Sequence, residues 1–270
     1  MLYRIVKNLM LKVREVSDLR SFRAVFPDVV AGRVACLIWR DFATNMIEVD
    51  AVERIVARLD EAVVPSDTGI LTPPRTDMDP HVQFQHCAAA LPDFAELAPL
   101  STSTLDALAD AWHFGLSPKT LWEQPVKAFT LRALHPGGFF APHIDRRCDF
   151  VSQINTPQRR LALNIYLHCA SCQGGLLAFW SPVQDEVLSE QIFTQHFSER
   201  YLHFDEEPVH VKPRTGDLVL FDSEVPHAVT MLLTGIRATW SSFVGYHGPD
   251  SVLEVCCKAN ARNLKDGPTA

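Results

Sequence analysis

The spacing of hydrophobic residues changes character near the middle of the chain. In the first half, one set of apolar side chains recurs at helical spacing: Val52, Ile55, Val56, Leu59 and Val63. Asp50 precedes this set and Glu53 follows three residues later, which predicts a helix that begins at Asp50. A second helix is predicted to begin at Ser103. Several proline residues make the stretch between the two helices irregular.

From about Val126 onwards, short runs of β-favouring residues alternate with Gly- and Pro-containing turn signals. The predicted strands are Val126–Leu134, Leu161–Leu167, Leu176–Trp180, Val209–Lys212, Leu218–Phe221, His227–Leu232 and Ala238–Tyr246. The segment 183–205 interrupts this series, is polar and is compatible with a helix. We interpret it as an insertion, and whether it acts as a lid stays open.

The two halves together predict a mainly β fold with a helical layer (α+β), built on a double-stranded β-helix of the jelly-roll or cupin-like type. We expect one domain with three regions. Residues 1–125 form a helical region packed on the core, residues 126–247 form the jelly roll with its insertion at about 183–205, and residues 248–270 form a tail. With 47% hydrophobic residues in 270 positions, the chain can fill such a core.

Charge and composition narrow the choice of partners. A net charge of −7 and a pI near 5.9 disfavour nucleic acid. The basic N-terminus lacks the apolar core of a secretory signal, and the apolar stretch 29–39 is too short to span a membrane. Seven scattered cysteines fit reduced thiols. We therefore expect a cytoplasmic protein with no membrane partner, and the sequence leaves open whether it forms a homodimer.

One set of residues has the composition of a metal site. His143 and Asp145 are separated by one residue, so an extended strand would turn both side chains to the same face. His227 follows 82 residues after Asp145 (227 − 145). Two imidazoles and one carboxylate leave three positions of Fe(II) open for a chelating cosubstrate and dioxygen. A second pair of the same spacing, His203 and Asp205, lies only 22 residues before His227 (227 − 205), too close for the intervening strands.

The order of short motifs over about 126–246 resembles that of the 2-oxoglutarate/Fe(II)-dependent oxygenase superfamily, closest to its prolyl 4-hydroxylase-like branch. The motifs are Pro136-Gly137-Gly138, Pro142-His143-Ile144-Asp145, Leu163-Asn164-Ile165-Tyr166-Leu167, Gly174-Gly175, the segment 212–221, Pro226-His227 and Arg237. The resemblance implies that His143, Asp145 and His227 bind Fe(II). It also implies that Arg237 pairs with the distal carboxylate of 2-oxoglutarate, for which a guanidinium fork is well suited.

Spacing gives a further prediction for Arg237. If Thr234 and Gly235 turn a hairpin, Arg237 lies opposite about Leu232, roughly 16 Å from His227 at the rise of a strand. An imidazole, a metal ion, a five-carbon diacid and a guanidinium would fill that gap.

Two polar residues of one predicted strand are further candidates for cosubstrate binding. Asn164 and Tyr166 share one face by parity, and the matching positions in the family often help to hold the cosubstrate. The alternative is that either residue is a polar group of the core. Leu134 stands where many relatives have a tyrosine, so Tyr166, Thr130 or Thr239 is expected to supply the second hydrogen bond to the cosubstrate.

The resemblance implies an Fe(II)- and 2-oxoglutarate-dependent dioxygenase that hydroxylates an unactivated C–H bond while 2-oxoglutarate is converted to succinate and CO2. Ascorbate is a candidate reductant. We expect a small amino-acid-like substrate, because Arg146 and Arg147 would offer cations near the metal, with surface ion pairs as the alternative. Trp240 is expected to line the substrate pocket.

Three other functions stay open at this point. Within the superfamily, the enzyme could hydroxylate a peptidyl, prolyl-type side chain, or demethylate alkylated nucleobases, although the acidic chain gives the latter no support. From another class, the chain could be a cupin-like metal-binding isomerase or a ligand-binding module, neither of which needs Arg237.

Overall fold

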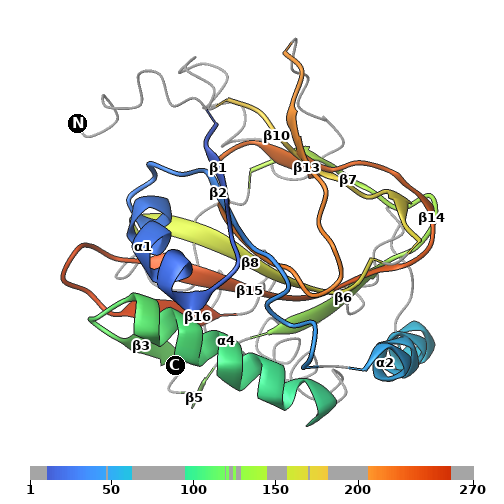
Figure 1. Ribbon diagram of the computed structural model, residues 1–270, viewed down its shortest axis with the longest axis horizontal. Helices are drawn as coiled ribbons and strands as arrows, with labels where there is room; N and C mark the ends of the chain where they lie inside the picture. The colour runs from blue at the N-terminus through green and yellow to red at the C-terminus, as the bar shows by residue number, and fades with distance from the viewer. Residues whose placement is uncertain are drawn as a thin grey trace, which may run out of the picture.

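The computed structural model describes residues 11–46, 48–62, 95–118, 120–121, 124–125, 129–144, 157–169, 171–181 and 206–256. Figure 1 shows two β-sheets that face each other, with helices packed on the outer side of the larger sheet. The predicted insertion at 183–205 lies outside the described residues. No helix among the described residues combines the length and the apolar character needed to span a membrane.

Among the described residues, the larger sheet contains eight strands, and most of its pairs are antiparallel. In spatial order they are β1 (Val13–Val16), β2 (Cys36–Trp39), β12 (Leu218–Asp222), β8 (Arg159–His168), β15 (Arg237–Tyr246), β16 (Leu253–Cys256) and β3 (Leu116–Pro118), with β6 (Thr130–Leu134) also paired to β15.

The smaller sheet contains four strands, in the order β11 (Val209–Val211), β10 (Leu177–Phe179), β13 (His227–Val229) and β7 (Phe140–His143). Two short ribbons accompany the sheets: β14 (Leu232–Thr234) with β9 (Gln173–Gly174), and β4 (Thr120–Leu121) with β5 (Gln124–Pro125).

From β6 to β15 the chain passes repeatedly between the two sheets, with β10 and β11 following one another in the smaller sheet. The larger sheet receives β6, β8, β12 and β15, whereas the smaller sheet receives β7, β10, β11 and β13. This alternation of antiparallel strands between two facing sheets is the double-stranded β-helix, so the predicted fold class is confirmed. Each predicted strand matches an observed one to within a few residues among the described positions, except that His227–Leu232 divides into β13 and β14.

Side-chain alternation along β8 explains how one strand serves two cores. Leu161, Leu163 and Ile165 point to the outer side, where they pack with the helices. Ala162 and Tyr166 point inward and join the core between the two sheets. Because side chains alternate along a strand, this assignment tells for every residue of β8 whether its side chain points to the inner or the outer face of the larger sheet.

The helices cover the outer face of the larger sheet with their apolar sides. They are α1 (Leu19–Val30), α2 (Val49–Ala62), the short 3-10 turn η1 (Ala95–Leu97) and α4 (Ala98–Ala111). The sequence pattern did not reveal α1, which is capped by the Asp18 carboxylate accepting a hydrogen bond from the backbone N–H of Ser21 at 2.8 Å.

The predicted helix starts differ from the observed ones. Ser103 lies inside α4, which begins at Ala98 with Pro99 in its first turn, where a missing N–H breaks no helical hydrogen bond. The hydroxyl of Thr104 donates to the carbonyl of Leu100 at 2.7 Å, so it is satisfied within the helix. The first predicted helix begins at Val49, one residue before Asp50.

The N-terminal region is more than the helical layer that we expected for residues 1–125. Its strands β1 and β2 extend the larger sheet beyond β12, and β3 joins the opposite edge. The predicted tail also contributes a strand, β16, which pairs with β15. All four residues of β2 are buried, and the strand merges in the sequence with the apolar stretch 29–39, which begins inside α1, so the pattern did not reveal it.

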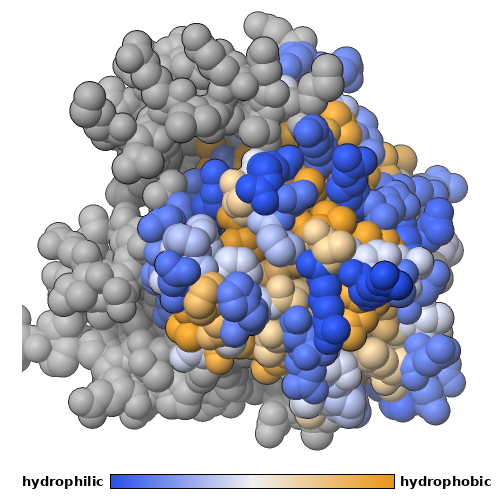
Figure 2. Space-filling model, turned by 60° about the vertical axis from the view of Figure 1, so that its left-hand side comes forward, coloured by the Kyte–Doolittle hydropathy of each residue, from blue (hydrophilic) through white to orange (hydrophobic). Residues whose placement is uncertain are grey.

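The surface is mixed in character. On the face shown in Figure 2, hydrophobic areas are interrupted by hydrophilic side chains. Among the described residues, the exposed large hydrophobic side chains are Met46, Val209, Met231, Leu233 and Val252. Single exposed apolar residues of this kind are ordinary for a folded surface.

Candidate active site

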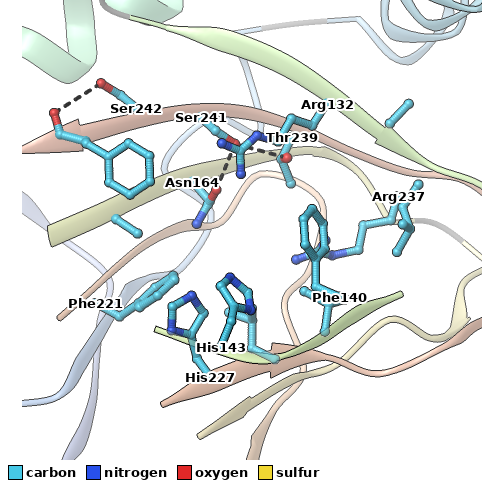
Figure 3. Close-up of a pocket in the computed structure, with 16 residues that line it drawn as sticks. Arg132, Phe140, His143, Asn164, Phe221, His227, Arg237, Thr239, Ser241 and Ser242 are labelled. Carbon is cyan, nitrogen blue, oxygen red and sulfur yellow. Dashed lines mark hydrogen bonds between the residues drawn. The ribbon is translucent and has the colours of Figure 1, made fainter. Parts of the chain in front are cut away.

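A cavity lies between the two sheets, and it brings together residues that are far apart in the sequence. Its sixteen lining residues are Arg132, Ala133, Leu134, Phe140, His143, Ala162, Asn164, Leu177, Phe221, His227, Val229, Arg237, Thr239, Ser241, Ser242 and Phe243 (Figure 3). The volume of the cavity is about 40 Å³. Among the described residues that line it, two are arginines and none is an aspartate or glutamate.

The smaller sheet places two imidazoles next to each other. His143 of β7 and His227 of β13 are direct cross-strand partners, so their side chains share one face of the sheet. Their ring centroids are 4.3 Å apart, and the ring planes are inclined by 51°. Figure 3 shows both rings on the side of the cavity opposite Asn164 and Ser241. The predicted histidine pair is therefore formed by the fold.

The hydrogen bonding of His227 suits a metal ligand. This side chain is only 3% exposed, and its Nδ1 lies 2.8 Å from the carbonyl oxygen of Val225. A carbonyl can only accept, so the contact assigns the proton to Nδ1 and the lone pair to Nε2. Metal-binding histidines commonly donate their second ring N–H to such an oxygen, which fixes the orientation of the ring.

Two phenylalanines flank the imidazole pair. Phe140 stacks on His143 with a centroid distance of 6.0 Å, and the edge of Phe221 meets His227 at 4.8 Å. The Phe221 ring is itself supported by Phe179 at 5.3 Å. This apolar surround limits the access of water to the imidazoles and restricts their movement.

The third ligand of the predicted metal triad is the carboxylate of Asp145. Asp145 lies outside the described residues, as do Arg146 and Arg147 and the alternative pair His203 and Asp205. Among the described residues, no cluster of three or more His, Cys, Asp or Glu side chains is arranged to hold a metal. The two imidazoles fit a 2-His-1-carboxylate centre in donor type, and Asp145 stays a prediction.

Arg237 supplies the observation that best fits an anionic cosubstrate. Its guanidinium lies in the cavity wall, and the residue is 6% exposed. Its Nη2 donates to the Tyr166 hydroxyl at 2.7 Å, whereas its Nε is buried with no hydrogen-bond partner. Among the described residues, no carboxylate forms a salt bridge with it. A buried cation left in this state creates a strong preference for an anion.

Tyr166 supports this arginine from within the core. The residue is fully buried, and the guanidinium carbon of Arg237 lies 4.9 Å from the centroid of its ring. Burial raises the pKa of the Tyr166 hydroxyl to about 12, although the charge of Arg237 opposes that rise. The hydroxyl therefore keeps its proton while its oxygen accepts from Arg237, so it can also donate to a bound carboxylate.

The position of Arg237 rests on a different pairing from the one we predicted. The hairpin at Thr234 and Gly235 does not form, because β14 and β15 belong to different sheets. Leu232 pairs with Gly174, whereas Arg237 pairs with Leu134 of β6. The hairpin from which the distance between Arg237 and His227 was estimated is therefore wrong, although both residues line the same cavity.

Parity along β15 gives the cavity a row of polar side chains. Thr239 and Ser241 follow Arg237 on the inner face, opposite Tyr166 and Asn164 of β8. The Ser241 hydroxyl lies 2.7 Å from Asn164 Oδ1 and 3.1 Å from the Thr239 hydroxyl. Asn164 thus lines the cavity as predicted, while Tyr166 contacts Arg237 without appearing among the lining residues.

The prediction that Trp240 lines the substrate pocket is wrong. Trp240 lies on the outer face of β15, where it stacks on Phe129 at 5.6 Å and its indole N–H donates to the Ser101 hydroxyl of α4 at 2.9 Å. The physical reason is the alternation of side chains along a strand, which turns residue 240 away from the face that carries residues 237, 239 and 241.

The sequence analysis did not identify Arg132 and Phe221, which also line the cavity. Arg132 had a detectable signal, because it alternates with the apolar residues Leu131 and Ala133 in a short strand. The role of Phe221 depends on which strand faces β13, and no pattern in the sequence shows that.

The sequence of the cavity-forming segment is similar to that of a known protein family. Residues 129–245 match the family model described as the 2OG-Fe(II) oxygenase superfamily. The resemblance recognised from the sequence is confirmed for this segment, which contains the strands from β6 to β15. The expectation of an enzyme of the 2-oxoglutarate-dependent oxygenase class is confirmed with it. No curated protein matches the sequence.

Several solved structures resemble the chain weakly. An N-substituted L-amino acid dioxygenase from Burkholderia ambifaria AMMD is 19% identical, with a TM-score of 0.49, and the match covers 86% of this chain and 91% of that one. A Pseudomonas putida prolyl-4-hydroxylase is 18% identical, with a TM-score of 0.43 and coverage of 84% and 100%. A 2OG-Fe(II) oxygenase family oxidoreductase from Burkholderia pseudomallei is 11% identical, with a TM-score of 0.47 and coverage of 90% and 100%. Likenesses of this strength decide nothing about the substrate.

Proposed function

We propose that the protein is an Fe(II)- and 2-oxoglutarate-dependent hydroxylase that acts on a small amino-acid-like substrate. The observation that carries this proposal is Arg237, a buried cation with an unpartnered Nε in the same cavity as two adjacent imidazoles. A cupin-like isomerase or a ligand-binding module does not need this arginine.

The proposal assigns a role to each residue of the cavity. His143, His227 and Asp145 would hold Fe(II), with His227 binding through Nε2 because its Nδ1 is engaged by Val225. Arg237 would receive the distal carboxylate of 2-oxoglutarate, and the Tyr166 hydroxyl would donate a second hydrogen bond to it. When bound, iron and 2-oxoglutarate would activate dioxygen, so that one oxygen atom is used to convert 2-oxoglutarate to succinate and CO2 and the other hydroxylates a C–H bond of the substrate.

The remaining cavity residues position the substrate and keep the site dry. Phe140 and Phe221 exclude water from the imidazoles, and the row of Asn164, Thr239 and Ser241 offers hydrogen bonds on the opposite wall. The proposal includes dioxygen as the second substrate and ascorbate as a reductant to be tested. It also keeps the expectation of a cytoplasmic enzyme.

The test is an anaerobic titration of 2-oxoglutarate into the Fe(II)-loaded protein, monitored by the weak visible charge-transfer band of the chelate. We expect the band in the wild type, its loss in His227→Ala and Asp145→Ala, and a much weaker affinity in Arg237→Ala. A matched control is Arg23→Gln, which removes an exposed salt bridge with Asp110 and leaves the cavity intact. Unaltered spectra in Asp145→Ala and Arg237→Ala would remove the assignment.

A further inference from the structure

Two cysteines lie close together between β8 and β9 and have no role in the proposed reaction. Cys169 directly follows β8, and Cys172 directly precedes β9. The backbone N–H of Cys172 donates to the carbonyl of Cys169 at 3.3 Å, which closes a turn between them. The two α-carbons at the ends of such a turn are less than about 7 Å apart. A disulfide spans this separation, so the backbone already brings the two cysteines within bonding reach.

The side chains of both cysteines pack against the same core. Both are half-buried free thiols, and both contact the inner hydrophobic cluster that contains Tyr166 and Leu232. Burial raises the pKa of the Cys169 thiol to about 12, and the neighbouring Cys172 adds to this rise. Burial also raises the pKa of the Cys172 thiol. Both groups are therefore mostly protonated at neutral pH, and their exchange with other thiols is slow.

Cys172 also contacts the residues that lead into Arg237. Its thiol donates to the carbonyl of Ile236 at 3.1 Å. A Cβ added to Gly235 would lie only 3.2 Å from its Sγ, so the chain passes close to this sulfur. The charge of Arg237 opposes the rise in the pKa of both thiols, which places its guanidinium within electrostatic range of the pair. A displacement of the Cys172 sulfur therefore reaches the backbone that positions Arg237.

We propose that Cys169 and Cys172 form a reversible disulfide that weakens the binding of 2-oxoglutarate in the cavity. Closure of the disulfide would draw the Cys172 sulfur towards Cys169 and away from the Ile236 carbonyl, and so would shift the start of β15. This inference rests on the proposed function, because it needs 2-oxoglutarate to bind at Arg237.

The oxidant in this reaction is a small-molecule disulfide such as oxidised glutathione. The thiolate of Cys172 attacks one sulfur of that disulfide, an S–S bond to Cys172 forms, and one small thiol leaves. The thiolate of Cys169 then attacks the Cys172 sulfur, and the second small thiol leaves. The two cysteines lose two electrons and two protons, and the small disulfide is reduced to two thiols.

Thermodynamic linkage gives the disulfide a second observable effect. If oxidation weakens 2-oxoglutarate binding about tenfold, bound 2-oxoglutarate favours the reduced pair by the same factor. For a couple of two electrons, a factor of ten corresponds to about 30 mV. The midpoint potential of the pair should therefore be about 30 mV higher when 2-oxoglutarate saturates both redox forms.

The experiment uses the full-length protein loaded with Mn(II), in anaerobic glutathione buffers of defined potential. Wild type, Cys169→Ala and Cys172→Ser are equilibrated until the thiol count is constant, and peptide mass spectrometry locates any disulfide. Calorimetry then measures the dissociation constant of 2-oxoglutarate. Cys172→Ser is a matched control, because its hydroxyl can still donate to the Ile236 carbonyl while no disulfide can form at this position.

We expect a disulfide between Cys169 and Cys172 in the oxidised wild type, with a 2-oxoglutarate dissociation constant about tenfold higher than in the reduced protein. Each variant should bind 2-oxoglutarate equally in oxidising and reducing buffer. The potential titration of the wild type, with and without 2-oxoglutarate, decides the coupling even if a variant fails to fold.

Three results would overturn the inference: no disulfide between these two cysteines in oxidising buffer, a disulfide that leaves the dissociation constant and the midpoint potential unchanged, or an equal loss of affinity in both variants. The last result would assign the effect to other cysteines of the chain. Failure of the reduced wild type to bind 2-oxoglutarate would instead refute the proposed function, and the peptide map would still decide whether the disulfide forms.

Discussion

Replacing Arg237 by methionine should maintain or raise the free energy of unfolding of the protein while it weakens the binding of 2-oxoglutarate. Methionine has a similar length, carries no charge and fills irregular spaces well. The change removes a buried cation whose Nε has no partner, and this relief is worth up to several kcal/mol. It also removes the donor to the Tyr166 hydroxyl, a loss of about 1–3 kcal/mol. Without ligands, we therefore expect an unfolding free energy that is unchanged or higher by up to about 2 kcal/mol.

The effect on ligand binding should have the opposite sign. At a concentration of 100 times its dissociation constant, 2-oxoglutarate stabilises the wild type by about 2.7 kcal/mol. Loss of a buried charged partner costs at least about 2 kcal/mol, or about 30-fold in affinity. At the same ligand concentration, the stabilisation of Arg237→Met should therefore fall below about 1 kcal/mol.

The assay is thermal and denaturant unfolding with and without 2-oxoglutarate, with Mn(II) in place of Fe(II) so that no turnover occurs. The control is Arg159→Met, because Arg159 pairs at 2.7 Å with the nearly buried Asp222 outside the cavity lining. That variant should lose about 1–2 kcal/mol of stability, since Arg159 is partly exposed, and keep the full response to 2-oxoglutarate. The reasoning is refuted if Arg237→Met loses more than about 2 kcal/mol and still responds fully to the ligand.

Three further predictions concern individual side chains. Absorbance titration of tyrosinate should show one of the four tyrosines ionising only near pH 12, and this late step should be absent in Tyr166→Phe. Because the pKa of Tyr166 is higher in the folded protein than in the unfolded chain, where it is about 10, the neutral hydroxyl contributes to the free energy of unfolding. That contribution is complete below about pH 10 and is lost as the pH rises towards 12. Trp240→Phe should lower the unfolding free energy by about 1 kcal/mol through loss of its bond to Ser101, and a changed 2-oxoglutarate affinity would contradict the outward orientation of this residue. Phe221→Ala should weaken metal retention about 10-fold or more, because the ring that holds His227 is gone, and equal metal content after dialysis would count against this role.

The jelly roll was largely predictable because its runs of β-favouring residues are separated by Gly- and Pro-containing turns. Strands β2 and β16 were not predictable in this way: β2 merges in the sequence with the apolar stretch 29–39, which begins inside α1, and β16 is a short strand that depends on pairing with β15. Helix α1 was missed although Asp18 caps it, because Pro27 interrupts its pattern.

The candidate site was predictable only as far as side-chain type and local parity allow. The identities of His143, His227 and Arg237 carried the chemical information, but the pairing that brings them together depends on strand register over long distances. The hairpin error arose because a turn at Gly235 was taken to join neighbours in one sheet, whereas the chain changes sheets there. The error on Trp240 was avoidable, since a residue three positions after Arg237 must face the other way along a strand.

The most direct test of the central claim is an anaerobic crystal structure with Fe(II) and 2-oxoglutarate, with the metal located by anomalous scattering at the iron edge. The account predicts one iron bound by Nε2 of His227, by His143 and by Asp145, with the distal carboxylate of 2-oxoglutarate on Arg237. Iron bound at His203 and Asp205, or 2-oxoglutarate away from Arg237, would contradict it.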